Sequence, residues 1–184
     1  MVKECFQSLR CFLLLTLLTG VMYPLLITVV GQLVWPEKAR GSLVSRDQTI
    51  VGSELIAQKF ASDRYFHSRP SAGDYVAVPS GASNLAPTSA ALKEGVQARV
   101  KIYGEQAPFD LLTTSGSGLD PHLSPEAVLN QLDRVANKRG LTGPSVDQLR
   151  ALVVSLVEPP TFGFMGKSRV NILKLNLAID RSFP

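Results

Sequence analysis

One short segment holds the residues whose types could support hydrolytic chemistry. The segment TTSGSGLDPH, residues 113–122, contains Ser115, Ser117, Asp120 and His122. A serine nucleophile needs a base within hydrogen-bonding reach, and in α/β-hydrolases it lies in a G-x-S-x-G turn. The first glycine of that turn is absent before both serines. The pattern favours a structural glycine-rich connection, and it leaves open a loop that binds an anion or a partner.

A second segment, FGFMGKS at residues 162–168, resembles the end of a phosphate-binding P-loop. A P-loop requires a glycine five positions before its last glycine, with a strand before the loop and a helix after it. Thr161 occupies that first position, prolines precede the segment, and a strand is expected to follow it. The segment is therefore predicted to be a turn, and not a nucleotide site.

Composition and residue spacing argue against metal, redox and nucleic-acid chemistry. His67 and His122 are far apart and lack the spacing of zinc ligands. The two cysteines, Cys5 and Cys11, lie at or before the start of an apolar stretch, so the remaining chain cannot form a disulfide. The net charge of +4 is mild and scattered, which indicates no nucleic-acid partner. Arg69, next to a proline, is predicted to pair with an acid of the same chain.

The pattern of apolar residues predicts helices at residues 54–61, 89–104, 125–139 and 145–156. Each is preceded or begun by a residue that can accept hydrogen bonds from the free N–H groups of a helix start: Ser53, Thr88, Ser124 and Ser145. Pro125 suits the first position of its helix, and Gly140 suits the position after the last turn. We expect the last two helices to form a hairpin.

Three segments are expected to be extended: residues 43–51, 109–114 and 169–180. In the last, RVNILKLNLAID, leucines alternate with polar residues as in a half-buried strand. Residues 63–89 contain three prolines and little periodicity. Their aromatic and aliphatic side chains, Tyr65, Phe66, Tyr75 and Leu85, predict a long ordered loop. Interleaved helices and strands predict a single mixed soluble domain of the α/β or α+β class.

An uncharged apolar stretch precedes this domain. Residues 11–36 contain no charged residue and are long enough to cross a hydrocarbon core of about 30 Å. That length favours a retained transmembrane helix over a cleaved signal peptide. Pro24 is expected to kink the helix, and nearby glycines and threonines suit packing against other helices. The positive charges that flank the stretch do not decide its orientation.

Several motifs together resemble one family. They are YFHSRPSA at 65–72, SGASNLAPT at 80–88, DLLTTSGSGLDPHLSPEA at 110–127 and RVNILKLNLAID at 169–180. In this combination they are similar to the C subunit of the Kdp-type potassium-transporting P-type ATPase, the KdpC family. The resemblance covers the N-terminal anchor and nearly the whole soluble domain.

The resemblance implies an accessory, non-catalytic subunit with one membrane helix in the plasma (inner) membrane of a bacterium. It implies residues 1–10 in the cytoplasm, residues 11–35 in the membrane and residues 36–184 outside the cell. The implied partners are a P-type ATPase catalytic subunit, a potassium-channel-like subunit, a small hydrophobic subunit and membrane lipid. The implied complex imports K⁺ with ATP and Mg, and the family has been described as a catalytic chaperone that raises ATP affinity.

The same resemblance implies no firmly bound cofactor, with at most a transient ATP contact. No catalytic or metal-binding residue is assigned. Candidate partner-contact or functional-loop residues are His67, Arg69, Ser83, Asn84, Ser115, Ser117, Asp120 and His122. Two alternatives remain: a membrane-anchored extracytoplasmic hydrolase that uses the Ser115–His122 loop, and a free-standing ligand-binding domain.

Overall fold

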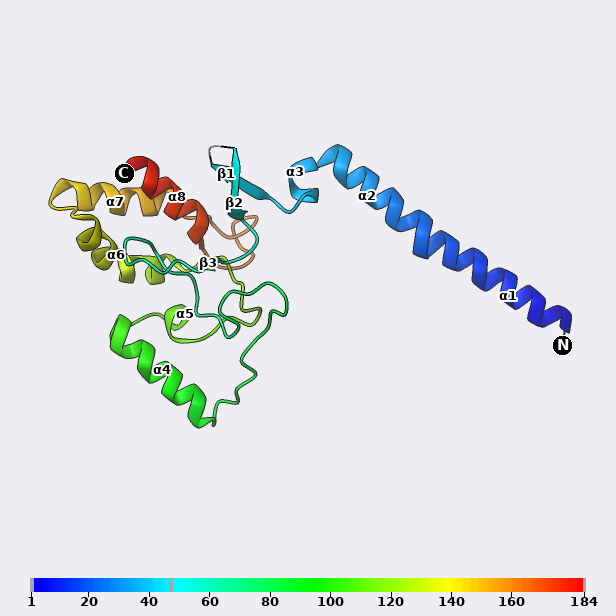
Figure 1. Cartoon of the computed structure of the whole chain (residues 1–184), viewed down its shortest axis with the longest axis horizontal. Coiled ribbons are helices and arrows are strands. Elements are labelled where there is room, and N and C mark those ends of the chain that lie inside the picture. Colours follow the sequence, from blue (N-terminus) through cyan, green and yellow to red (C-terminus); the bar gives the residue numbers. More distant parts are fainter. Residues whose placement is uncertain (1, 47, 184) are drawn as a thin grey trace. The chain divides into compact units, whose positions relative to one another are not determined.

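The computed structural model describes residues 2–46 and 48–183. The chain divides into two compact units, Met1–Leu43 and Val44–Pro184. Figure 1 shows a long single helix in the first unit and helices with irregular segments in the second.

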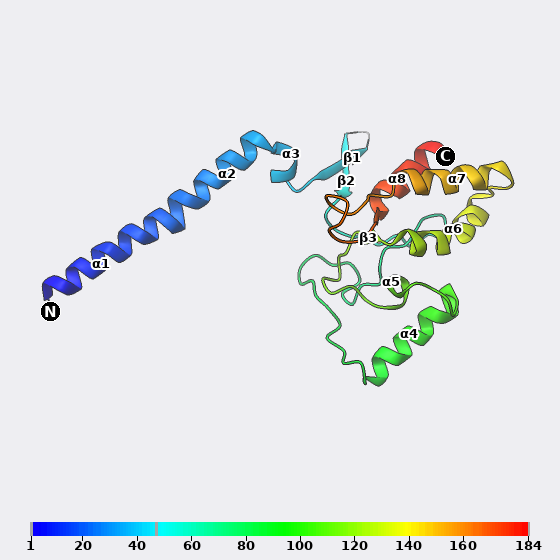
Figure 2. The same ribbon diagram turned by 180° about the vertical axis from the view of Figure 1, so that it is seen from behind.

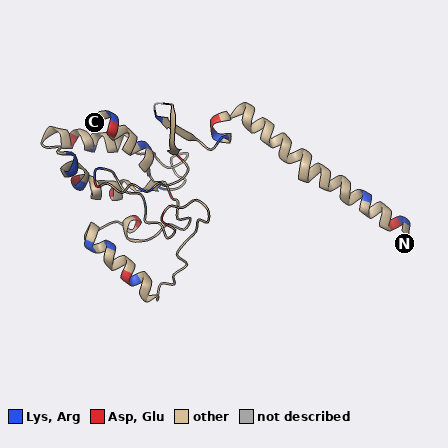
Figure 3. Cartoon of the chain, in the orientation of Figure 1, with Lys and Arg blue, Asp and Glu red and all other residues tan. Residues whose placement is uncertain are grey.

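The first unit is dominated by a continuous helix over Val2–Val34, which is long and apolar enough to cross a membrane. It consists of α1 (Val2–Leu17), a π-helical turn η1 (Leu18–Met22) and α2 (Tyr23–Val34), followed by the short α3 (Pro36–Ala39). The helix begins before the apolar stretch does. Figure 3 shows that most of its length carries no charged residue.

The π turn lies directly before Pro24, where a kink was predicted. Proline has no N–H for the usual helical hydrogen bond, and π turns are one way in which a helix accommodates this loss. The Tyr23 N–H donates to the Leu18 carbonyl across this turn. The Thr28 hydroxyl donates to the Pro24 carbonyl at 2.8 Å, one turn back along the helix.

The second unit is an α+β domain, and thus the α+β alternative of the predicted fold class. Its elements are β1 (Leu43–Arg46), β2 (Thr49–Ser53), α4 (Ala90–Tyr103), α5 (Phe109–Leu112), β3 (His122–Leu123), α6 (Pro125–Arg139), α7 (Pro144–Ser155), β4 (Val170–Asn171) and α8 (Ile172–Ser182). Strands β1 and β2 form one two-stranded sheet, and β3 pairs with β4 in antiparallel register, with His122 opposite Asn171. The expected extended pieces at 43–51 are confirmed.

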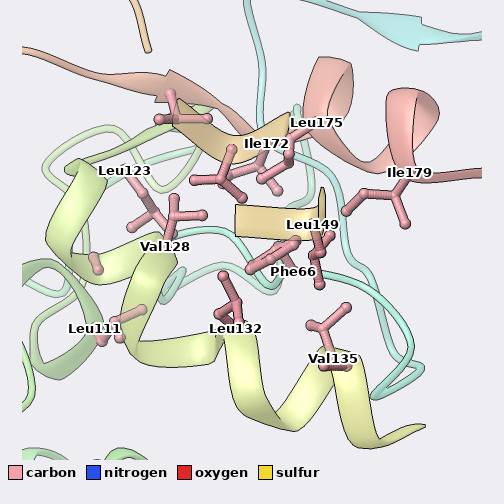
Figure 4. Packing of buried hydrophobic residues seen from close by; sticks show 14 residues of the cluster. Phe66, Leu111, Leu123, Val128, Leu132, Val135, Leu149, Ile172, Leu175 and Ile179 are labelled. Atoms are coloured by element: carbon pink, nitrogen blue, oxygen red, sulfur yellow. The ribbon is translucent and has the colours of Figure 1, made fainter. Parts of the chain in front are cut away.

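The core lies among α6, α7 and α8 (Figures 1, 2 and 4). Helix α6 supplies buried residues at the 3.6-residue spacing of one helical face, among them Val128, Leu132 and Val135. Figure 4 shows these side chains pointing toward Phe66, which is fully buried although it comes from the irregular segment. The prediction that residues 63–89 form a loop is confirmed, and Phe66 anchors its first part, whereas the predicted anchor Leu85 is exposed.

The start and end of α6 agree with the sequence prediction. The Ser124 hydroxyl accepts a hydrogen bond from the Ala127 N–H at 3.3 Å, and Gly140 ends the helix with φ of 70°. That φ lies in the left-handed region, which glycine adopts without steric cost. Helices α6 and α7 form the expected hairpin (Figure 1).

Two other predicted caps are wrong. Helix α4 begins after Ser89, not after Thr88, and α7 begins after Gly143 with Pro144 at its first turn. Proline has no N–H group, so a helix that begins with proline has one fewer N–H that needs a cap. In α4 no residue is fully buried, so this helix lies at the edge of the core.

The C-terminal segment was predicted to be a strand and is mostly the helix α8. The Asn171 side chain accepts a hydrogen bond from the Lys174 N–H at 3.1 Å and so caps the helix. Its buried residues Ile172, Leu175, Asn176 and Ile179 follow helical spacing. The alternating leucines fit a strand, but Ile172 and Asn176, which would lie on the other face of a strand, are buried together with Leu175, and this pattern fits only a helix.

The predicted helix at 54–61 is a turn followed by irregular chain. The Ser53 hydroxyl accepts from the Leu55 N–H at 3.1 Å, which makes a tight turn and not a helix cap. The Ala57 N–H donates to the Leu119 carbonyl at 2.9 Å, and the Glu54 carbonyl accepts from the Asn171 side chain at 2.8 Å. These tertiary hydrogen bonds replace the helical ones.

The predicted strand at 109–114 is also wrong. Residues Phe109–Leu112 form the single helical turn α5, with Leu111 fully buried and Phe109 71% exposed. A short apolar run does not distinguish a strand from a buried helical turn, and here the apolar residues do not share one buried face.

Candidate functional site

Two side-chain amides hold the backbone of the irregular segment around residues 66 and 67. Asn176 of α8 accepts from the Phe66 N–H and donates to the Phe66 carbonyl, both at 2.9 Å. Gln131 of α6 does the same for His67, at 2.9 and 3.1 Å. Both amides are 1% exposed. Because buried backbone groups must be paired, these amides replace a missing neighbouring strand.

Two arginines of α6 extend this support to the preceding residues. Arg134 donates to the carbonyls of Asp63 and Tyr65 at 2.8 and 3.1 Å. Arg139 donates to the Arg64 carbonyl at 2.8 Å, and its guanidinium lies 5.1 Å from the centre of the Tyr65 ring. Carbonyls along Asp63–His67 are thereby satisfied by side chains from two helices, so the segment is fixed without secondary structure.

Asp180 of α8 completes this arrangement. Its carboxylate accepts from Arg139 at 2.8 Å, and from Tyr65 and Arg46 at 3.1 Å each. Burial alone would raise the pKa of Asp180, but the hydrogen bonds from Arg139, Tyr65 and Arg46 lower it below its ordinary value. The carboxylate is thus held in its charged form.

The loop that follows is joined to the glycine-rich segment 113–122. Arg69 pairs with Asp120 at 3.2 Å, which confirms the predicted intramolecular ion pair. The Tyr75 hydroxyl donates to the Arg69 carbonyl at 2.9 Å, and burial raises the pKa of Tyr75 to about 12. The Ser115 N–H donates to the Pro70 carbonyl at 3.0 Å. The loop around Arg69 and the glycine-rich segment 113–122 are far apart in the sequence, and these contacts hold them together in the folded domain.

A glycine permits the close approach of a third segment. Gly118 has φ of +73°, and a Cβ atom there would lie 2.7 Å from the Gly81 carbonyl oxygen. An alanine would meet both a backbone clash and a strained φ. Nearby, the Thr114 hydroxyl contacts the Ser83 hydroxyl at 3.3 Å, whereas Asn84 is exposed with φ of 52°. Of the two candidate residues Ser83 and Asn84, only Ser83 contacts the glycine-rich segment.

The serines of the glycine-rich segment do not form a nucleophile–base pair. Ser115 is 1% exposed, and its hydroxyl oxygen has no hydrogen-bond partner. The Ser117 hydroxyl accepts from the Leu119 N–H at 3.1 Å. His122 lies beside Asp120, with 4.0 Å between Nδ1 and Oδ1, and burial lowers its pKa. Within residues 2–46 and 48–183, no hydrogen bond joins a serine hydroxyl of this segment to His122.

In the described part of the chain, His67 makes no hydrogen bond with Ser115, Ser117 or Asp120. Its ring Nε2 is 3.3 Å from the Ser62 carbonyl, and burial, followed by the nearby Arg134 charge, lowers its pKa. A neutral imidazole is therefore favoured at neutral pH. Among the described residues no group of three or more His, Cys, Asp or Glu side chains is placed to hold a metal ion.

The segment that resembled a P-loop is a turn. Thr161 and Met165 are bridged, with N–H to carbonyl distances of 2.9 Å in both directions, and β4 follows before α8 begins. Lys167 is exposed. At the tip, Phe162 and Phe164 are 83% and 78% exposed, a feature that the sequence reasoning missed.

The supporting polar residues were also missed by the sequence reasoning, namely Gln131, Arg134, Arg139, Asn171, Asn176 and Asp180. Their signal in the sequence is weak but present, since Gln131 and Asn176 occupy buried positions of helical periodicity. A buried amide requires hydrogen-bond partners, and such a position indicates a polar network.

The fold and this network define a class of protein: an α+β domain with rigidly supported loops, preceded by one candidate membrane-spanning helix. A sequence profile of KdpC, described as K⁺-transporting ATPase, c chain, matches residues 5–181. The chain therefore belongs to the KdpC family.

Its relatives cover the same length. The chain is 47% identical to the potassium-transporting ATPase KdpC subunit of Shewanella putrefaciens, over 97% of this chain and 92% of that one. It is 45% identical to the subunit of the same name from Rhodopseudomonas palustris, over the full length of both. For Cereibacter sphaeroides the identity is 48% over 98% of each chain.

Proposed function

We propose that this chain is a non-catalytic accessory subunit of an ATP-driven potassium import complex in the plasma membrane of a bacterium. The observation that carries this proposal is the family membership: the KdpC profile matches residues 5–181, and relatives named potassium-transporting ATPase KdpC subunit are 45–48% identical over nearly the whole chain. In the described part of the chain, Ser115 and Ser117 also make no hydrogen bond with His122, and a serine nucleophile needs such a base. A fixed loop surface is what a docking subunit needs.

The anchor helix takes part in assembly as well as in membrane attachment. None of its residues is buried within this chain, and it carries Gly20, Gly31 and a π turn. Small residues allow close approach of neighbouring membrane helices. Its partners are the catalytic ATPase subunit, the potassium-channel-like subunit and the small hydrophobic subunit. Replacing residues 11–35 by poly-leucine should retain membrane insertion and weaken co-purification.

The soluble domain lies outside the cell in this proposal. Protease added to intact spheroplasts should then degrade the chain beyond the membrane helix, while an N-terminal tag stays protected. Protection of the domain until the cells are lysed would reverse this orientation.

The chain also raises the affinity of the catalytic subunit for ATP. Such an effect acts through a difference in binding between two states of the complex, and it requires no firm ATP site on this chain. The measurement is the ATP dependence of hydrolysis by the purified complex with and without this subunit. An unchanged KM for ATP would leave assembly as the sole role.

Co-purification from mild detergent tests the main proposal. A tagged chain should bring down a large multi-span ATPase and restore growth at low K⁺ in a strain that lacks this subunit. Ser115→Ala and Ser117→Ala should leave growth unchanged. A hydrolase activity that is lost in either variant, without any captured ATPase, would favour the membrane-anchored hydrolase.

A further inference from the structure

A cavity of about 510 Å³ lies between α4 and the loop segments that pack against it. Its polar lining comes from Ser71, Ser83, Thr114 and Arg99, which belong to three different segments of the chain. The remaining lining is small or aliphatic, including Ala72, Leu85 and Leu92. Ligand pockets of this size typically combine an apolar wall with a few convergent polar groups.

The serine hydroxyls of this cavity have protons left to donate. Ser71 Oγ accepts from the N–H groups of Gly73 and Tyr75, at 3.2 and 3.0 Å. Ser83 Oγ accepts from the Thr114 hydroxyl at 3.3 Å. Among the described residues neither serine donates its own O–H to a protein acceptor. Since a hydroxyl is both donor and acceptor, each retains a donor for a ligand.

Arg99 supplies the charge. One of its amino groups donates to the Leu112 carbonyl at 2.9 Å, which leaves the other N–H donors of the guanidinium available. No carboxylate in the described part of the chain forms an ion pair with Arg99. The cavity therefore presents a cation and two hydroxyl donors, and its lining contains no acidic side chain.

Gly95 keeps this cation accessible. It lies inside α4, where glycine is less favourable than alanine, and it lines the cavity. A Cβ atom at this position would lie 3.4 Å from a guanidinium nitrogen of Arg99, in van der Waals contact with it. The absence of a side chain at this position thus leaves room beside the charge.

We propose that this cavity binds a small organic anion, with its carboxylate or phosphate group on Arg99, Ser71 and Ser83 and a short apolar body against the aliphatic wall. These donors, with no acidic side chain among the lining residues, favour an anionic group, because an anion accepts charge-assisted hydrogen bonds, a neutral group accepts weaker ones, and a cationic group accepts none. Planar, forked N–H donors suit the two oxygens of a carboxylate or phosphate. The site is separate from the serines of the 115–122 segment.

The test is an NMR titration of the full chain in detergent micelles at constant ionic strength. The probes are butyrate, inorganic phosphate and the neutral isostere butyramide. The NMR chemical shifts of Ser71, Ser83 and Arg99 are expected to change saturably with butyrate or phosphate and not with butyramide. Arg99→Gln should weaken the affinity roughly tenfold or more, because it removes a charge-assisted hydrogen bond.

The matched control is Lys101→Gln, which removes an exposed positive charge from the same helix and should leave the affinity unchanged. Ser83→Ala removes only a hydroxyl, keeps the chain folded, and should weaken binding severalfold. Absence of saturable shifts with both anions would overturn the proposal. The same conclusion follows if binding persists in Arg99→Gln or is lost equally in Lys101→Gln.

Discussion

Replacing Asn176 should destabilise the domain far more than replacing an exposed asparagine. Asn176 is 1% exposed and makes two hydrogen bonds of 2.9 Å with the backbone of Phe66. In Asn176→Ala both buried backbone groups lose their partner, at about 1–3 kcal/mol each. The higher helix propensity of alanine offsets about 0.5 kcal/mol. The expected loss is about 2–5 kcal/mol.

Urea unfolding of the purified full chain in detergent measures this loss. The near-ultraviolet circular dichroism of the tyrosines reports on the soluble domain, which contains Tyr65, Tyr75 and Tyr103. With a urea dependence of about 2 kcal/mol per molar, the midpoint should fall by about 1–2.5 M. A loss of that size is a large part of a typical domain stability of roughly 5–15 kcal/mol.

The control is Asn137→Ala, at an exposed position of α6, which should have no effect or stabilise slightly. Asn176→Asp tests the direction of the two bonds. It keeps an acceptor for the Phe66 N–H, but places a second oxygen against the Phe66 carbonyl and buries a charge, so it should destabilise as much as alanine. The reasoning is refuted if Asn176→Ala and Asn137→Ala unfold at the same urea concentration.

Three further predictions concern the turn at 161–167 and the ion pair of α8. Lys167→Ala should leave the ATP affinity of the complex unchanged, because the turn lacks the P-loop glycine and a following helix; a tenfold or greater loss in a nucleotide-binding assay would make it a nucleotide site. The double change Phe162→Ser and Phe164→Ser should leave thermal unfolding unchanged, since both side chains are exposed, and should weaken co-purification if this tip docks on a partner subunit; equal recovery of the complex would exclude that role. Because the pKa of Asp180 is lowered in the folded state, its contribution to stability is complete above the ordinary value of 3.8 and is lost as the pH falls toward the lower folded value. The Asp180→Asn variant should therefore be less stable than the unmodified chain near neutral pH, and it should lose less stability between about pH 5 and pH 3. If the free energies of urea unfolding of the two proteins fell in parallel over this pH range, the prediction would be wrong.

Local chemistry determined the parts of this protein that the sequence predicted correctly. The anchor is recognisable because some twenty apolar residues without charge suit a bilayer and little else. Helix α6 was predicted at both ends because Ser124 and Gly140 act on backbone groups within a few residues of themselves. The sequence predicted that Arg69 pairs with an acid of the same chain. It did not identify that acid, because Asp120 is 51 residues away along the chain.

Tertiary contacts decided the rest. Residues 54–61 have a helical pattern, but their N–H and carbonyl groups bond to Leu119 and Asn171 instead. The alternating leucines of residues 169–180 fit a strand, but Asn176 is hydrogen-bonded to Phe66 and buried on the same side as Leu175, which is possible only in a helix. Periodicity describes which residues are apolar, and it does not state which distant backbone group a buried amide will meet.

The candidate site shows the same division. The sequence by itself determined the family, the membrane-spanning segment and the loops that carry the polar residues. It could not show that Ser115 is buried without a base, that Asn176 and Gln131 replace a strand, or that Ser71, Ser83 and Arg99 line one cavity. These facts depend on segments that are tens of residues apart in the chain and become neighbours only when the core of α6, α7 and α8 closes around Phe66. Hydrogen bonds and burial depend on distance in space and not on distance along the chain.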